Sequence, residues 1–264
     1  MSAPVHRARA AAFFDLDKTI LATSSSMALR EPLVAAGLLT RREMAIGMLI
    51  HVPYLIAGAD DERMEKMKVS LGEMTAGWDA NLLEATVQDA LETSIDPVCY
   101  TEALDLISLH HAAGLDVVVA SASPIEMVRP IARLLGADHA IGTIAEKDED
   151  GILTGEILVY NYGAEKARGC RELAAKQGWD LAECFAYSDS VSDVPLLESV
   201  GHPGAVNPDS DLRAVAHERD WQVLSFSQTA RVRPSPARVA VPAAILGAGV
   251  AAASWVLWKA SRKG

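Results

Sequence analysis

The stretch Ala10-Ala-Ala-Phe-Phe-Asp15-Leu-Asp17-Lys-Thr19 decides how the rest of the chain is interpreted. Its apolar run, Ala10 to Phe14, predicts a buried strand. Asp15 and Asp17 follow where this strand ends, so their carboxylates can converge as the chain turns. Two acids this close repel each other unless a cation lies between them, and oxygen ligands beside a phosphate suit Mg²⁺. Taken alone, the pair is explained equally well as a cap for the next helix.

The composition is that of a globular chain, since 50% of the 264 residues are hydrophobic and 22% are charged. The net charge is −11; six of the 24 Lys and Arg residues and none of the 35 acidic residues follow Gln228, so the preceding body carries −17. A body this acidic binds nucleic acid poorly, and no nucleic-acid partner is expected. Cys99, Cys170 and Cys184 are widely and irregularly spaced, which predicts reduced thiols rather than a disulfide or zinc framework.

The segment from Leu21 to about Asp96 predicts helices only. Its apolar residues recur at intervals of three and four, as in Met64, Met67 and Leu71. After Pro97 apolar strands alternate with helices, a pattern typical of a parallel sheet with crossover helices. We therefore expect an α/β fold, with a doubly wound (Rossmann-like) parallel sheet as its core and the helical block inserted into it.

Two later strand ends also carry polar side chains. The predicted strand Asp116 to Ala120 runs into Ser121-Ala-Ser123-Pro124, followed by a predicted helix to Leu135. Hydroxyl and backbone N–H groups at such a junction form a phosphate cradle, although serine is also a common helix cap. The predicted strand Cys184 to Tyr187 ends in Ser188-Asp-Ser-Val-Ser-Asp193, a second acidic pair. Ligands of open parallel sheets bind at these carboxyl ends.

Lys166 lies in the first turn of a helix predicted over Ala164 to Gln177. A cation at this position opposes the helix dipole, so the side chain is either solvated or directed at an anion.

In chain order these motifs are Asp-x-Asp-x-Thr, Ser, Lys and an Asp pair. The set resembles the haloacid dehalogenase superfamily, specifically the phosphoserine-phosphatase-like branch with a helical cap after the first motif, and the resemblance covers roughly Ala10 to Phe226. It implies that Asp15 attacks phosphorus to give an aspartyl-phosphate and that Asp17 is the general acid and base. It implies Mg²⁺ held by Asp15, the Asp17 backbone carbonyl and Asp189, with Asp193 in its water shell. The implied phosphate-binding residues are Thr19, Ser121, Ala122 and Lys166.

The expected domains are a catalytic core (1–20 and 98–228) and a helical cap (21–97). The expected function is Mg²⁺-dependent hydrolysis of a small-molecule phosphomonoester. The alternatives are a phosphoserine phosphatase proper, a lysophospholipid-phosphate phosphatase at a membrane, and a receiver-like signalling domain. A receiver domain has no use for a helical insertion or for a second acid two residues past the phospho-accepting one.

Three positions depart from the phosphoserine phosphatases that this chain resembles. Ser24 stands where they place a Glu for the substrate ammonium, and Lys68 falls near their Arg for the substrate carboxylate. Ser188 replaces the glycine before the fourth motif. Because serine cannot make a charge-assisted bond and lysine lacks the fork of arginine, we expect weak activity on phosphoserine.

The C-terminal part reads as a linker, 229–238, followed by the charge-free segment Val239 to Trp258. As a helix of 20 residues it would span about 30 Å, the thickness of a bilayer's hydrocarbon core. We expect a C-terminal hydrophobic helix that anchors the protein in a membrane. No apolar leader follows the basic N-terminus, because Phe14 runs straight into Asp15, so the catalytic body is expected at the cytoplasmic face.

Overall fold

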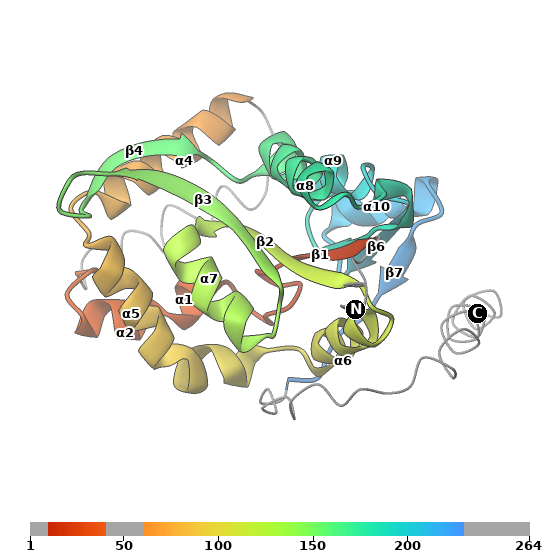
Figure 1. The fold of residues 1–264 in the computed structure, drawn as a ribbon, viewed down its shortest axis with the longest axis horizontal. Coiled ribbons are helices and arrows are strands. Elements are labelled where there is room, and N and C mark those ends of the chain that lie inside the picture. The colour runs from red at the N-terminus through yellow and green to blue at the C-terminus, as the bar shows by residue number, and fades with distance from the viewer. Residues whose placement is uncertain (1–9, 41–60, 230–264) are drawn as a thin grey trace, which may run out of the picture.

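The computed structural model describes residues 10–40 and 61–229 (Figure 1). In chain order its helices and strands are β1 (Ala11–Asp15), α1 (Ser25–Ala28), α2 (Arg30–Ala35), α4 (Asp61–Thr75), α5 (Ala80–Ala90), α6 (Thr101–Ala112), β2 (Asp116–Pro124), α7 (Ile125–Leu134), β3 (His139–Lys147), β4 (Leu153–Val159), α8 (Gly163–Gln177), β5 (Phe185–Ser188), α9 (Val194–Leu197), β6 (His202–Val206), α10 (Ser210–Glu218) and β7 (Gln222–Leu224). A short 3-10 turn, η4 (Val191–Asp193), precedes α9.

The seven strands form one sheet in the order β4-β3-β2-β1-β5-β6-β7. Every neighbouring pair is parallel except β3 with β4. From β1 the chain moves outward through β2 to β3, and it later continues from β5 on the other side of β1. The direction of winding therefore changes at β1, and such a switch point is where ligands bind in open α/β sheets. The predicted parallel α/β sheet is confirmed, with β4 as an antiparallel addition.

Helices cover both faces of the sheet because the central strand is apolar on both sides. Ala12 and Phe14 of β1 pack in one hydrophobic cluster with residues of α6 and α7. Ala11 and Phe13 point the other way, into a cluster with residues of α8, α9 and α10. A strand buried on both faces reads as a continuous apolar run instead of an alternating one.

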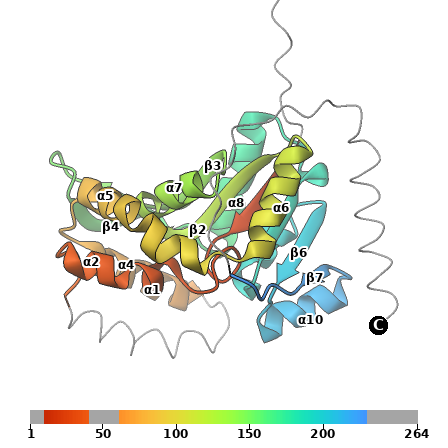
Figure 2. The same cartoon turned by 90° about the horizontal axis from the view of Figure 1, so that it is seen from below.

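The described part of the insertion between β1 and β2 is helical, as predicted. Its helices α1, α2, α4 and α5 lie to one side of the strands (Figure 2). The two ends of the insertion are bonded to each other, since Ala22 N donates to Val98 O at 2.7 Å and Tyr100 N to Ile20 O at 2.8 Å. The insertion therefore leaves and re-enters the core at one place.

Strand β3 continues to Lys147 and pairs with β4 as an antiparallel hairpin. Two parts of the fold differ from the sequence prediction. Strand β2 runs past Ala120 to Pro124, with a register shift between these two residues. Beyond Glu198 the prediction specified no elements, whereas the structure has β6, α10 and β7.

The predicted anchor segment, 239–258, lies outside the described residues. Among residues 10–40 and 61–229, no helix has both the length and the apolar character needed to cross a bilayer.

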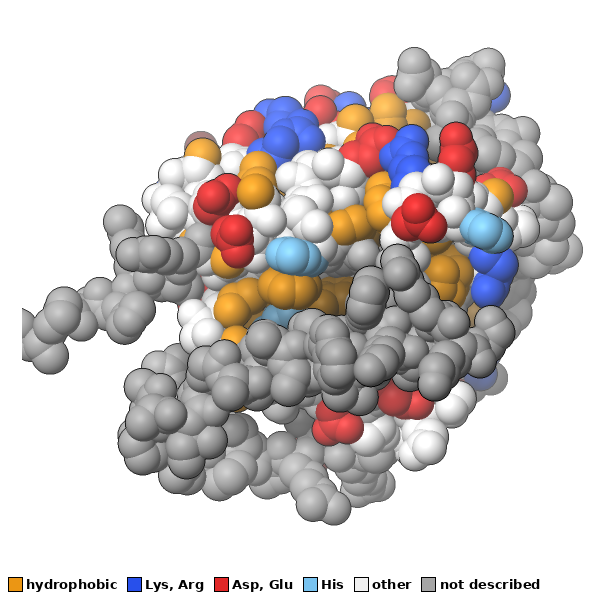
Figure 3. All heavy atoms as spheres, turned by 90° about the vertical axis from the view of Figure 1, so that its right-hand side faces the viewer, with side chains coloured by type: hydrophobic (Ala, Val, Ile, Leu, Met, Phe, Trp, Pro, Cys, Tyr) orange, Lys and Arg blue, Asp and Glu red, His pale blue; other side chains and the backbone are white. Residues whose placement is uncertain are grey.

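One face of the molecule shows how the charges are spread (Figure 3). Lys and Arg side chains on it lie beside Asp and Glu side chains, with hydrophobic side chains and histidines between them. The ion pairs in the described chain include Arg129 with Glu84 and Arg168 with Glu165. Exposed pairs of this kind typically contribute about 0–1 kcal/mol each, so the apolar clusters dominate stability.

Candidate active site

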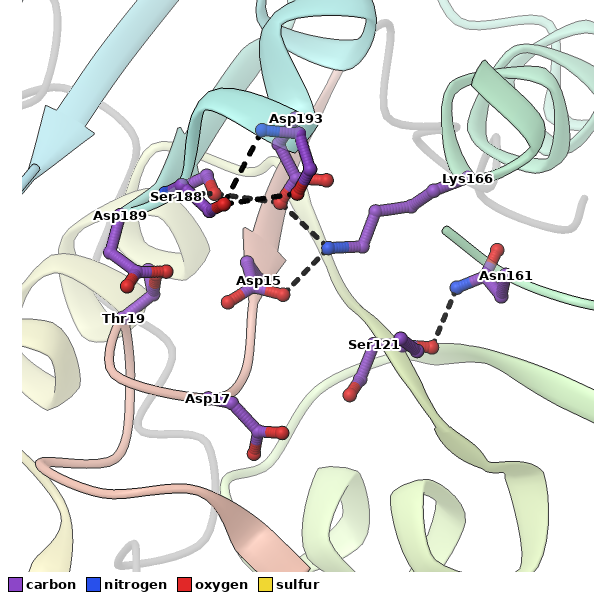
Figure 4. A network of polar contacts seen from close by, with 12 residues as sticks. Asp15, Asp17, Thr19, Ser121, Asn161, Lys166, Ser188, Asp189 and Asp193 are labelled. Atoms are coloured by element: carbon purple, nitrogen blue, oxygen red, sulfur yellow. Dashed lines mark hydrogen bonds and ion pairs between the residues drawn. The ribbon is translucent and has the colours of Figure 1, made fainter. Parts of the chain in front are cut away.

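The carboxyl ends of β1, β2 and β5 bring the predicted site residues to one edge of the sheet (Figure 4). Asp15 ends β1, Ser121 lies on the shifted part of β2, and Ser188 ends β5. Lys166 comes from the first turn of α8 and points into the same region. The placement follows from the topology, because parallel neighbours of β1 must end beside it.

Lys166 links two of the predicted acids. Its ammonium donates to Asp15 Oδ1 at 2.6 Å and to Asp193 Oδ2 at 2.7 Å. All three side chains are at least nine-tenths buried. Of the two explanations open for Lys166, the structure therefore supports the anion-directed one, and the helix-dipole cost is offset by two carboxylates.

Two hydroxyl side chains, those of Ser188 and Thr19, also contact acids of this group. The Ser188 hydroxyl donates to Asp193 Oδ2 at 2.6 Å, on the same oxygen that Lys166 contacts. Thr19 is fully buried, and its hydroxyl makes a long contact of 3.5 Å with Asp189 Oδ1. Thr19 thus contacts a carboxylate in this structure, although the resemblance had implied a phosphate-binding role.

Asp17 lies apart from this charged group (Figure 4). Lys18, the residue after Asp17, has a positive φ of 62°, which turns the chain directly after the second acid. The Asp17 Oδ1 atom accepts the backbone N–H of Ser25, the first residue of α1, at 2.7 Å. The two carboxylates therefore have separate partners.

The shifted C-terminal part of β2 is held by side chains that the sequence did not single out. Asn161 Nδ2 donates to Ser121 O at 2.7 Å, and Thr143 Oγ1 donates to Ala122 O at 2.6 Å. Ser121 Oγ accepts the N–H of Ser123 at 3.1 Å. The sequence signal for Asn161 is weak, because an Asn before a helix is explained as an ordinary turn residue.

The site has more buried negative charge than one lysine balances. Burial raises the pKa of Asp15, which Lys166 lowers and the neighbouring carboxylates raise further. Burial likewise raises the pKa of Asp189. Burial also raises the pKa of Asp17, although hydrogen bonds from the backbone N–H and side chain of Ser25 lower it in part. Burial lowers the pKa of Lys166, but Asp15 and Asp193 outweigh it and raise the value, so this side chain stays protonated.

The excess of negative charge and the all-oxygen donor set fit a hard divalent cation such as Mg²⁺. Within the described residues, no three His, Cys, Asp or Glu side chains are already gathered as a metal-binding group. A set of two carboxylates, one backbone carbonyl and water does not need three such side chains, because Mg²⁺ usually keeps several waters.

A doubly wound α/β fold with an acidic cluster at its switch point is compatible with hydrolases that use a carboxylate at a strand end. The chain belongs to the haloacid dehalogenase-like hydrolase family, whose sequence pattern matches residues 12–198. The resemblance inferred from the motifs is confirmed, and the receiver-like alternative is not retained.

The chain is also similar to named proteins and to a solved structure. A Mycobacterium tuberculosis protein named a probable phosphatase is 48% identical over 244 residues, which span 90% of this chain and 85% of the relative. Another M. tuberculosis protein, named a phosphoserine phosphatase, is 35% identical over 246 residues, spanning 90% of this chain and 77% of that one. A solved structure from Bordetella pertussis, of a protein described as having unknown function, has a TM-score of 0.70 and 30% identity. It covers 82% of this chain and 98% of its own.

Proposed function

We propose that this protein is a phosphatase that hydrolyses a small phosphomonoester through a covalent intermediate on Asp15. The observation that supports this most directly is the 2.6 Å contact between Lys166 Nζ and Asp15 Oδ1 at the carboxyl end of β1. A buried ammonium beside the nucleophile both orients it and attracts the negative oxygens of a phosphoryl group. The names of the two M. tuberculosis relatives point to the same reaction class.

In the first step an Asp15 oxygen attacks phosphorus, and the bond between phosphorus and the substrate's alkoxy oxygen breaks as the new P–O bond forms. Asp17 gives its proton to the departing alkoxy oxygen. In the second step Asp17 takes a proton from water, whose oxygen attacks phosphorus and displaces the Asp15 carboxylate. The products are an alcohol and inorganic phosphate. Separate partners for the two acids suit these separate roles.

Mg²⁺ would be held by the side chains of Asp15 and Asp189 and by the Asp17 backbone carbonyl, with Asp193 in contact through its water shell. When bound, it would neutralise part of the charge that the carboxylates and a phosphate bring together. Lys166 and the Ser121–Ala122 backbone would bind the phosphoryl oxygens.

The described helices of the insertion, within 21–97, would form a cap over the core built from 1–20 and 98–228. What supports this division is the bonding of the two insertion ends to each other beside β1. A cap in this place would exclude water and select the substrate's alcohol.

The test of the reaction class is phosphate release from a panel of phosphomonoesters, with Mg²⁺ and after its removal by EDTA. We expect release by the wild type with Mg²⁺ and a loss of activity with EDTA that added Mg²⁺ restores. An inactive wild type across the panel, or full activity in Asp15→Asn, would reject the proposal.

Phosphoserine is a second candidate substrate, because one relative is named for it. The structure gives no charge at the position expected to bind its ammonium, since Ser24 Oγ accepts the N–H of Met27 as a helix cap. Lys68 is half-buried on α4 and lacks the forked guanidinium of an arginine. Without both charged contacts we expect kcat/KM on phosphoserine to be about 10²–10³-fold below that on the best alkyl phosphomonoester. Phosphoserine as the best substrate by tenfold would overturn this expectation.

Attachment to a membrane through 239–258 stays a prediction of the sequence. Cell fractionation of the full chain, compared with a chain that ends at Ser227, tests it directly. Recovery of the full chain in the soluble fraction would contradict an anchor.

A further inference from the structure

Ser25 makes two contacts that connect separate parts of the candidate site. Its backbone N–H donates to Asp17 Oδ1 at 2.7 Å, and its hydroxyl lies 2.9 Å from the hydroxyl of Ser123. Ser25 is fully buried. It begins the inserted helices, whereas Ser123 lies 98 residues further on, in the shifted C-terminal part of β2, the loop-like stretch after Ala120.

Ser123 continues the connection into the phosphate-binding loop. Its backbone N–H donates to Ser121 Oγ at 3.1 Å. A chain of hydrogen bonds therefore runs from Asp17 through Ser25 and Ser123 to Ser121. The inserted helices and the loop-like end of β2 meet in this chain through two neutral hydroxyls.

Helix capping does not explain why residue 25 is a serine. Helix α1 is capped by Ser24, whose side chain accepts the N–H of Met27. The Ser25 hydroxyl is thus not used by the helix; it lies 2.9 Å from the Ser123 hydroxyl and also interacts with the Asp17 carboxylate. A buried hydroxyl pair costs free energy unless both groups are bonded, which ties the position of α1 to that of the loop.

We infer that Ser25 and Ser123 are positioning residues that aim Asp17 at the leaving group, an inference that rests on the proposed phosphatase activity. The Ser25 N–H holds Oδ1, which leaves Oδ2 as the oxygen that carries the proton to the alkoxy oxygen. The contact with Ser123 fixes Ser25, and therefore Asp17, relative to the loop that would hold the phosphoryl group. A displacement of about 1 Å in such an arrangement costs about 10²-fold in rate.

The test compares two leaving groups. An alkyl phosphomonoester needs a proton on its departing oxygen, whereas 4-nitrophenolate leaves as a stable anion. We expect Ser123→Ala and Ser25→Ala each to lower kcat/KM for the alkyl substrate about 10- to 100-fold and for 4-nitrophenyl phosphate less than about threefold. The double variant should equal Ser25→Ala, because Ser25→Ala already removes the contact with Ser123.

Ser25→Pro removes the N–H itself. Proline is accepted at the first position of a helix, and Ser24 has φ −77° and ψ 145°, which a residue before proline tolerates. The leaving-group difference should be larger in Ser25→Pro than in Ser25→Ala. Ser26→Ala is the matched control, since Ser26 is exposed on the same helix and bonds only to Ser24 among the contacts described.

Equal losses on both substrates, or no loss on either, in folded Ser123→Ala would overturn the inference. If Ser25→Pro does not fold, Ser123→Ala decides alone. A wild type that hydrolyses neither substrate would instead refute the phosphatase proposal, so the two failures are distinguishable.

Discussion

The two acids at the end of β1 sit in opposite kinds of surroundings. Asp15 belongs to a buried charged network with Lys166 and Asp193, all carried by the core. Asp17 is held by a neutral backbone N–H from Ser25, in the inserted helices. The proposed nucleophile, Asp15, is positioned by an ion pair, whereas the proposed acid, Asp17, is positioned by the start of helix α1. The position of Asp15 is therefore set at the end of β1, and that of Asp17 depends on where the inserted helices lie.

The largest effect is expected when the proposed nucleophile loses its charge. Asp15→Asn keeps the shape of the side chain but cannot form the covalent intermediate, and it leaves Lys166 with one carboxylate. We expect kcat to fall by more than about 10⁴-fold. Initial rates of phosphate release measure this. The matched control is Asp105→Asn, an exposed position on α6, which should retain full activity.

Asp17→Asn separates the two acids by reaction step. Loss of the general acid and base should lower turnover of an alkyl phosphomonoester by about 10²–10⁴-fold. With 4-nitrophenyl phosphate the first step needs no proton, so Asp15 should still be phosphorylated and hydrolysis of the intermediate should become slow. Stopped-flow absorbance should then show a burst of about one 4-nitrophenolate per active site. A slow linear trace without a burst would place Asp17 in the first step as much as in the second.

The core side of this comparison could be predicted from the sequence. Asp15, Lys166 and Asp193 lie at a strand end, in a helix's first turn and in a motif after another strand. The parallel topology brings the two acids together, whereas only the family resemblance predicts Lys166 beside them. The side that involves the insertion could not be predicted, because Ser25 and Ser123 are 98 residues apart and each is explained locally as a helix or turn residue.

The strands past Glu198 show a different limit. Strand β6, His-Pro-Gly-Ala-Val, contains a proline and a glycine, both of which argue against a strand, yet it pairs with β5 and β7. Strand β7 has three residues and too little sequence for a periodic pattern. Both strands form by pairing with their neighbours and not because of local propensity. Without a strand-like local sequence or a periodic pattern, neither could be recognised from the sequence.

The pH dependence of stability tests the apolar packing against β1 and β5, on the face covered by α6. His110 on α6 is buried against Phe14 and Phe185 and lies 2.9 Å from the hydroxyl of Tyr187. Burial, and to a lesser extent His111 and His202, lower the pKa of His110 from 6.5 to about 4.

Between these two pH values the unfolded chain binds a proton at this position and the folded chain does not. His110 should therefore contribute stability that is present above pH 6.5 and is lost as the pH falls to 4, by up to about 3 kcal/mol. Urea unfolding of wild type and His110→Gln at pH 7 and pH 4.5 measures the difference. Parallel losses of stability in both proteins would show that His110 is not responsible.

The smallest expected effect concerns the support of the charged network. Ser188 is fully buried and donates to the Asp193 oxygen that also accepts from Lys166. Ser188→Ala should let Asp193 move and, with it, the ammonium beside Asp15, which we expect to lower kcat/KM about 10- to 100-fold and to raise the Mg²⁺ concentration needed for half-maximal activity. Ser199→Ala is the control, because the one hydrogen bond of the Ser199 hydroxyl within residues 10–40 and 61–229 is to the Leu196 carbonyl of α9. Unlike Ser123→Ala, Ser188→Ala should slow alkyl and 4-nitrophenyl substrates equally, since the nucleophile is used by both. A loss confined to the alkyl substrate would mean that the two acids share one support.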